Sequence, residues 1–174
     1  REKNIPVRLK NTLNPRDEGT LITSETILED YKAVAAKDGI AVFRIKSDRM
    51  LMAYGFLRKV FEIFEAYKTP IDMITTSEVS VSITIDNTRF IDKIANDLRE
   101  LGTVEVEEEQ TIVCIVGDFR PDRTGSAPEI FEALDSIHLK MISYGGSPHS
   151  ISLLIDTKDK VNALNLLHKY LFKQ

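Results

Sequence analysis

Runs of mainly apolar residues predict β-strands at two well separated places in the chain. These runs are IAVFRIK (40–46) and TIVCIVG (111–117), and both are rich in the residue types that favour strands. After each of them come residues with helical spacing, then two further strand-like stretches, then a second helical stretch. The order strand, helix, strand, strand, helix therefore occurs twice.

Each predicted helix has one broad apolar stripe. In the first occurrence of this order, called the first pass here, the stripe is formed by Phe56, Leu57, Val60, Phe61, Phe64 and Tyr67. In the second pass it consists of Ile130, Leu134 and Ile137, with Ser126 as the expected N-cap and Pro128 in the first turn. The closing helices are predicted at roughly residues 89–101 and 159–172.

The predicted strands between these helices are IDMITT and EVSVSITID in the first pass, and MISYG and HSISLLID in the second. The alternation in VSVSITI indicates one buried face. After Gly102, the stretch TVEVEEE (103–109) predicts a fourth strand for the first pass.

The two passes are an internal repeat with an offset of seventy residues. Without gaps, residues 60–86 align with residues 130–156, and 7 of the 27 positions are identical, among them Asp86 and Asp156. The order βαββαβ is that of the ferredoxin-like plait. The sequence thus predicts an α+β protein of two such modules, at 40–109 and 110–174.

The second module has no residues left for its fourth strand, which would leave an open position in its sheet. We therefore expect a segment of the leading 39 residues to fill this position, and the apolar runs IPVRL and GTLIT are the candidates. Within the same segment, ILEDYKAVAAKDG (27–39) predicts a helix, with Ser24 or Thr26 as N-cap and Gly39 as C-cap.

Composition excludes several classes of protein. The 174 residues are 43% hydrophobic and 29% charged, which is typical of a globular chain. One cysteine cannot form an internal disulfide or a Cys-rich zinc site, so a reducing compartment, the cytoplasm, is expected. A net charge of −4 does not favour nucleic acid or an anionic membrane as a partner. Because the chain begins with Arg1, we expect a piece of a longer protein.

The string MLMAYGFLRKVFEIFEAYKTPIDMITTSEVSVSITID resembles the first regulatory ACT domain of aspartokinases. KMISYGGSPHSISLLID resembles the second ACT domain of that family, and NIPVRLKNTLNPRDEGTLI is similar to the segment that joins the kinase domain to its regulatory part. The resemblance implies that residues 1–39 contain the end of this linker, and that each module is an ACT domain.

The resemblance also implies what the fragment does. It would be the regulatory part of an aspartate kinase, a homodimer through its first ACT domain, with an amino-acid effector at the joint for feedback inhibition. The catalytic domain of the parent enzyme, which would use ATP and Mg, is not expected here. The sequence accordingly offers no catalytic residue, no metal ligand set and no cofactor motif: it has no phosphate-binding loop, and its three histidines are dispersed.

The residues themselves point to one candidate site for a free amino acid. Gly55, Phe56 and Leu57 open a predicted helix, and backbone N–H groups at a helix start can hold a carboxylate. Asp72 lies in an apolar strand start and could accept the ammonium group. Its counterpart in the second module is Ile142, so the fold does not require an acid there. Alternatively, Gly55 serves only the turn and Asp72 is a solvated edge residue.

The resemblance extends this effector site to five more residues, Met50, Ile71, Thr76, Ser77 and Glu78. The last three could equally be plain turn residues, and Met50 core filling. The expected effector is L-lysine, whose second ammonium group Glu78 could meet; L-threonine is the alternative. Ala53 and Pro70 stand where lysine-sensing relatives can have small hydroxyl residues.

Two other functional classes use the same plait. An RNA-binding module of the RRM type needs exposed aromatic residues on its central strands and a basic surface, and VSVSITI and ISLLI have no aromatic residue. A metal-carrying ferredoxin-like module needs a paired-cysteine motif, which one cysteine cannot supply.

Overall fold

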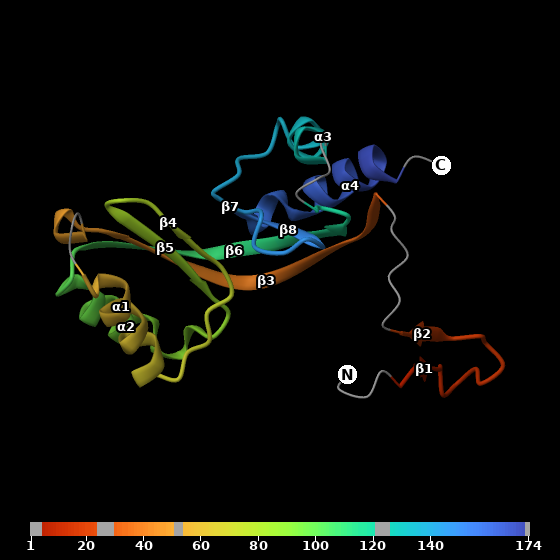
Figure 1. The fold of residues 1–174 in the computed structure, drawn as a ribbon, viewed down its shortest axis with the longest axis horizontal. Coiled ribbons are helices and arrows are strands. Elements are labelled where there is room, and N and C mark those ends of the chain that lie inside the picture. The colour runs from red at the N-terminus through yellow and green to blue at the C-terminus, as the bar shows by residue number, and fades with distance from the viewer. Residues whose placement is uncertain (1–4, 24–29, 51–53, 121–125, 173–174) are drawn as a thin grey trace.

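The computed structural model describes residues 5–23, 30–50, 54–120 and 126–172 (Figure 1). Ser24 and Thr26, the expected N-caps, lie outside these ranges. The described strands are β1 (Val7–Leu9), β2 (Thr20–Ile22), β3 (Tyr31–Lys46), β4 (Ile74–Thr76), β5 (Ser80–Ile85), β6 (Thr103–Gly117), β7 (Met141–Ser143) and β8 (Ser150–Asp156). The α-helices are α1 (Phe56–Ala66), α2 (Ile91–Arg99), α3 (Ser126–Ala133) and α4 (Lys160–Leu171). Short 3₁₀ turns cover Asp48–Met50, Thr88–Phe90 and Thr157–Asp159.

Six strands form one antiparallel sheet in the order β4-β5-β3-β6-β8-β7. Its two central strands, β3 and β6, are long, with 16 and 15 residues. The sequence predicts separate strands at 103–109 and 111–117, but the structure joins them into β6. Each half of the sheet, with its two helices, has the predicted ferredoxin-like order, so the fold class is confirmed.

The missing strand of the second module is the first half of β3. Residues 31–37 pair with residues 112–117 of β6, whereas residues 41–46 pair with β5 and with the first half of β6. The expectation that the leading 39 residues complete the second module is therefore confirmed, but the helix expected over 27–39 is wrong where the structure describes it. The alanines of this segment favour a helix, but tertiary context overrides propensity, and here the edge of β6 pairs with residues 31–37 as a strand.

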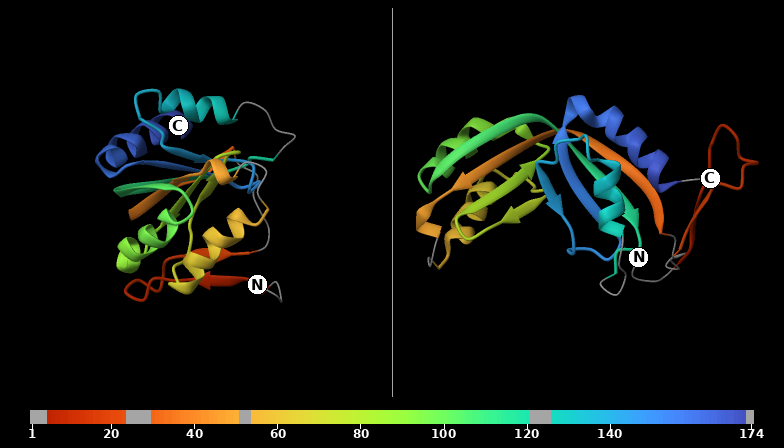
Figure 2. Two further views of the ribbon diagram at one scale, coloured as in Figure 1. Left: turned by 90° about the vertical axis from the view of Figure 1, so that its left-hand side faces the viewer. Right: turned by 90° about the horizontal axis from the view of Figure 1, so that it is seen from above.

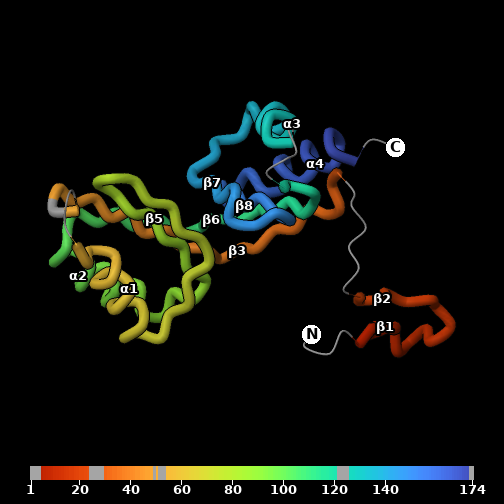
Figure 3. The backbone as a smooth tube through the Cα atoms, viewed as in Figure 1, coloured from red at the N-terminus to blue at the C-terminus, as the bar shows by residue number. Residues whose placement is uncertain are grey.

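The apolar runs expected to supply that strand are not the ones that do. Within the described ranges, β1 and β2, which lie in IPVRL and GTLIT, pair with each other alone and form a separate two-stranded sheet (Figure 3). The turn-rich residues between them favour this local hairpin, and the Asn11 side chain accepts a hydrogen bond from the Leu13 amide at 3.0 Å.

The helices of the two modules cover two separate cores. Figure 1 shows α1 and α2 below the sheet at one end, and α3 and α4 above it at the other; Figure 2 gives two further views. Fully buried side chains of the first core include Phe43, Val60, Phe64, Ile83 and Ile94. Those of the second core include Ile115, Ile130, Ile151, Leu153 and Leu167. Full burial of each such side chain stabilises the fold by about 1.5–3 kcal/mol.

A third apolar cluster connects the two modules. It consists of Ile40, Val42, Met73, Ile112, Met141 and Leu154. β4 and β7 end the sheet on opposite sides, yet they contact each other, so the sheet is strongly curled. The cluster makes the two modules one packed body.

Helix starts differ between the modules. Gly55 is the N-cap of α1, as predicted from the sequence. The described part of α3 starts with Ser126, and among the described residues the buried Ser126 hydroxyl has no hydrogen-bond partner, so the capping bond predicted for it is not formed there. No helix in the described ranges is long and apolar enough to cross a membrane.

Candidate functional site

The start of α1 has the properties of an anion site. Gly55 has φ 81° and ψ 9°, a left-handed conformation that glycine adopts without strain. Gly55 has no side chain to cap this helix start, so the N-cap residue leaves the first amides of α1 without a side-chain acceptor. Phe56 is 8% exposed and Leu57 packs against the first core, which anchors the first turn. Backbone N–H groups and the helix dipole there favour a carboxylate.

Asp72 lies just before β4 and is held at both its backbone and its side chain. Its amide donates to the carbonyl oxygen of Thr84 at 2.9 Å. Its carboxylate Oδ1 accepts a hydrogen bond from Lys37 Nζ at 2.7 Å, and the same Nζ lies 2.8 Å from Asp86 Oδ2. The sequence suggested an acid without a fixed partner, but Lys37 reaches it from β3.

The ion pairs of Lys37 shift the pKa values of Lys37 and Asp86. Hydrogen bonds to Asp72 and then to Asp86 raise the pKa of Lys37. The hydrogen bond from Lys37 lowers the pKa of Asp86. Sequence reasoning missed both Lys37 and Asp86, although Asp86 is one of the identities of the repeat.

Thr76, Ser77 and Glu78 form the exposed turn between β4 and β5. The Ser77 amide donates to the carbonyl oxygen of Ser80 at 2.8 Å, and the hydroxyls of these two serines lie 2.6 Å apart. The Thr76 hydroxyl donates to the carbonyl oxygen of Ser77 at 3.2 Å. These bonds fix the shape of the turn, which agrees with the alternative that Thr76, Ser77 and Glu78 are plain turn residues.

The structure divides the nine candidate residues into two groups within one chain. The first lies at one end of the sheet, where the Ser47 amide donates to the Val79 carbonyl and the Met50 amide to the Ser47 carbonyl, both at 3.0 Å. It contains Met50, the start of α1 with Gly55, Phe56 and Leu57, and the residues that join β4 to β5, Thr76, Ser77 and Glu78; Figure 1 shows these segments at the same end of the sheet. Ile71 and Asp72 lie at the other end of β4. Five residues of extended chain separate Asp72 from Ser77, a distance of about 16 Å. One amino acid therefore does not touch both groups of the same chain.

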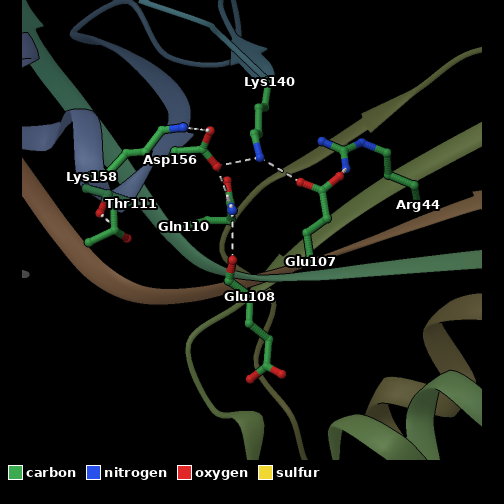
Figure 4. Close-up of polar contacts among 9 residues, drawn as sticks. Arg44, Glu107, Glu108, Gln110, Thr111, Lys140, Asp156 and Lys158 are labelled. Carbon is green, nitrogen blue, oxygen red and sulfur yellow. Dashed lines mark hydrogen bonds and ion pairs between the residues drawn. The ribbon is translucent and has the colours of Figure 1, made fainter.

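A second ion-pair network lies between the two modules (Figure 4). Lys140 Nζ is 2.7 Å from Glu107 Oε2 and 2.6 Å from Asp156 Oδ1, and Arg44 of β3 pairs with the other oxygen of Glu107. The hydrogen bonds from Lys140 lower the pKa of both carboxyls. Burial alone would lower the pKa of Lys140, but its bonds to Asp156 and Glu107 outweigh burial and raise it. The sequence predicts only that Glu107 belongs to a strand over residues 103–109.

A cavity of about 700 Å³ adjoins this network where the two long strands cross from one module to the other. It is lined by Gly39, Ile40, Thr88, Glu108, Glu109, Gln110, Asp156, Thr157 and Lys158. None of the sequence-predicted effector residues belongs to it. Gln110 is buried and donates to Glu108 O at 2.7 Å and to Asp156 Oδ1 at 3.2 Å. In the described part of the chain, no cluster of three or more His, Cys, Asp or Glu residues could hold a metal ion.

The fold and a family comparison define the class of the protein. Residues 113–171 match the family model of the ACT domain. This stretch holds most of the second βαββα unit, and the first half of the sheet has the same arrangement. The protein is therefore an ACT-domain protein with two such modules.

Relatives define the family more closely. A C-terminal regulatory domain of aspartate kinase from Porphyromonas gingivalis W83 is 45% identical, with a TM-score of 0.75, over 83% of this chain and 100% of that chain. The chain belongs to the aspartokinase family, as its regulatory ACT region. The aspartokinase of Schizosaccharomyces pombe is 36% identical over 97% of this chain and 38% of its own length.

One further solved structure is that of a full-length relative with amino acids bound. The structure of Escherichia coli aspartokinase III in complex with lysine and aspartate has a TM-score of 0.86 and 31% identity, over 99% of this chain and 40% of that chain. The chain thus spans about two fifths of the length of these full-length relatives.

Proposed function

We propose that the chain is a lysine-sensing allosteric domain that inhibits an attached aspartate kinase by feedback. The observation that carries the proposal is the start of α1, where the N-cap residue Gly55 has no side chain to bind the first amides of the helix. It is joined by the acid Asp72, whose counterpart in the second module is Ile142, so the fold itself does not need a carboxylate there. The solved complex of the Escherichia coli enzyme with lysine supports lysine as the ligand. In this proposal residues 40–109 bind the effector, and residues 110–174 with the first half of β3 form the second domain.

The site is completed by a second copy of the chain. β4 pairs with β5 on one side and has no strand on its other edge among the described residues. Antiparallel pairing of this edge with its own copy would be self-complementary, as a twofold interface requires. Such pairing would place Asp72 of one protomer beside the Thr76 and Ser77 end of the other. The two groups of candidate residues, which are separate in one chain, would then meet at the joint.

Each charged group of lysine has a partner in this arrangement. The amides that follow Gly55 would hold the carboxylate, and Asp72 of the other protomer would accept the α-ammonium group. Glu78, in the exposed turn, would meet the side-chain ammonium, which threonine lacks. Effector binding would inhibit the kinase domains only if it favours one arrangement of the dimer over another.

Calorimetric titration of the chain with L-lysine and L-threonine tests the proposal. We expect lysine to bind, and Asp72→Ala to weaken binding by about tenfold or more, because a hydrogen bond to a charged group contributes about 1.5–3 kcal/mol. Glu78→Gln should weaken lysine binding and leave any threonine binding unchanged. Unaltered lysine affinity in Asp72→Ala excludes this site, and binding of threonine alone excludes lysine as the effector.

A further inference from the structure

The carboxylate that we assign to the effector already holds an ammonium group of the protein itself. Lys37 Nζ lies 2.7 Å from Asp72 Oδ1, at the distance of a charge-assisted hydrogen bond. The side chain of Asp72 is 25% exposed and that of Lys37 is 47% exposed. The ammonium of Lys37 is chemically the same group that an amino acid would bring to Asp72.

Lys37 also has a second carboxylate to which it can remain bound. Its Nζ is 2.8 Å from Asp86 Oδ2, and Asp86 is 41% exposed. If Lys37 left Asp72, its charge would stay paired with Asp86. Two carboxylates and one ammonium leave a net charge of −1 in the triad, which one further ammonium group would neutralise. The triad can therefore accept an incoming cation, because Asp72 would be free to bind it and the net charge of −1 favours it.

We infer that Lys37 is an internal competitor of the effector, occupying Asp72 in the free protein and giving it up to the effector's ammonium group. This inference rests on the proposed function, since it requires that the effector bind at Asp72. Exposed ion pairs contribute little, so competition by Lys37 should lower the apparent affinity by only about two- to fivefold. Lys37 thereby sets the effector concentration at which the domain responds.

The position of Lys37 connects this exchange to the second module. Lys37 belongs to the half of β3 that completes the sheet of that module, where it pairs with Ile112. The next residue, Asp38, accepts a hydrogen bond from the Thr111 hydroxyl at 2.8 Å and pairs with Lys160 of α4. From adjacent positions of one strand, Lys37 thus forms ion pairs with the first module, and Asp38 forms a hydrogen bond and an ion pair with the second.

Calorimetric titration with L-lysine of three variants tests the competition. Lys37→Met keeps the length of the side chain and removes its charge, so we expect lysine to bind about two- to fivefold more tightly. Lys37→Arg keeps the competitor and should show no gain in affinity. Lys32→Met, an exposed lysine of the same strand, is the matched control and should bind lysine as the wild type does.

A second measurement follows Lys37 directly in the unaltered chain. The ¹⁵N–¹H NMR signal of its ammonium group, identified by its loss in Lys37→Arg, should shift on titration with L-lysine. Unchanged or weaker binding by a folded Lys37→Met, or an unshifted ammonium signal at saturation, overturns the competition. If Asp72→Ala weakens binding while Lys37→Met does not tighten it, only this inference fails. If the wild type binds no lysine, or Asp72→Ala binds it unaltered, the proposed function fails as well.

Discussion

Gly39 and Glu109 lie seventy residues apart, at equivalent positions of the repeat, and both have a positive φ, 73° and 56° respectively. Each lies in a β-bulge of its own long strand. Between the pairs Lys37–Ile112 and Ile40–Gln110, β3 has one residue more than β6, and between Ile40–Gln110 and Val42–Glu107, β6 has one more. The bulges mark the points where β3 and β6 pass from one module to the other.

Glu109 is the strained member of this pair, because a side chain disfavours positive φ by about 1–2 kcal/mol. We expect Glu109→Gly to raise the free energy of unfolding by about 1 kcal/mol, and Gly39→Ala to lower it by a similar amount. An added Cβ at Gly39 meets no atom within 4 Å, so the effect there is conformational and not steric. Urea denaturation of both variants measures it; a destabilised Glu109→Gly would contradict the argument.

Lys140 holds together two carboxylates from different strands, and its side chain is only 13% exposed. Lys140→Met would leave Glu107 and Asp156 without this shared cation. We expect the free energy of unfolding to fall by about 1–3 kcal/mol, with the larger value if Arg44 does not compensate. Lys158→Met is the control: Lys158 is 77% exposed and 3.8 Å from Asp156, and its loss should cost less than about 0.5 kcal/mol.

The same network predicts a pH dependence of stability. In the folded protein the pKa values of Glu107 and Asp156 lie below their ordinary values of 4.5 and 3.8, with the bond from Lys140 as the largest cause. Between the ordinary and the lowered pKa values the unfolded chain binds more protons than the folded one, so this stability is present at neutral pH and is lost as the pH falls from about 5 through the lowered pKa values. Urea denaturation across this range should show the loss, and Lys140→Met should make the curve flatter. An equal slope in both proteins would exclude the network as its source.

Much of the fold could be predicted from the sequence because its signals are local. Helical spacing placed α1, and alternation placed β5, so the first core follows from residues such as Val60, Phe64 and Ile83. The helix expected over 27–39 failed for a non-local reason: residues 31–37 are a strand because β6 has an open edge 75 or more positions away along the chain. Propensity within the segment contains no information about that edge.

The candidate site shows the same limit. Gly55 and Asp72 could be singled out from their types and from the repeat, in which Ile142 replaces Asp72. Lys37 could not, since it reaches Asp72 across 35 residues of sequence and only strand pairing brings it there. The sequence equally could not predict that Asp72 lies apart from the other group of candidate residues. The extended β4 holds Asp72 away from Ser77, and this separation is the reason why the proposed site includes a second copy of the chain.

Dimer formation and lysine binding should therefore be lost together. Ile74 lies on the free edge of β4 and is 41% exposed, near the centre of the proposed twofold interface. A charged residue on such an edge opposes edge-to-edge pairing, so Ile74→Lys should give a monomer in sedimentation velocity at micromolar concentration, with little effect on the melting temperature. Its lysine affinity should fall by about tenfold or more, as in Asp72→Ala, because each half site would lack its partner. Tyr144→Lys changes the equivalent position of the second module, which is 51% exposed, and should leave both the dimer and lysine binding intact. A monomeric Ile74→Lys that binds lysine with unaltered affinity would show that one chain contains the whole site, and would exclude the joint between protomers as its place.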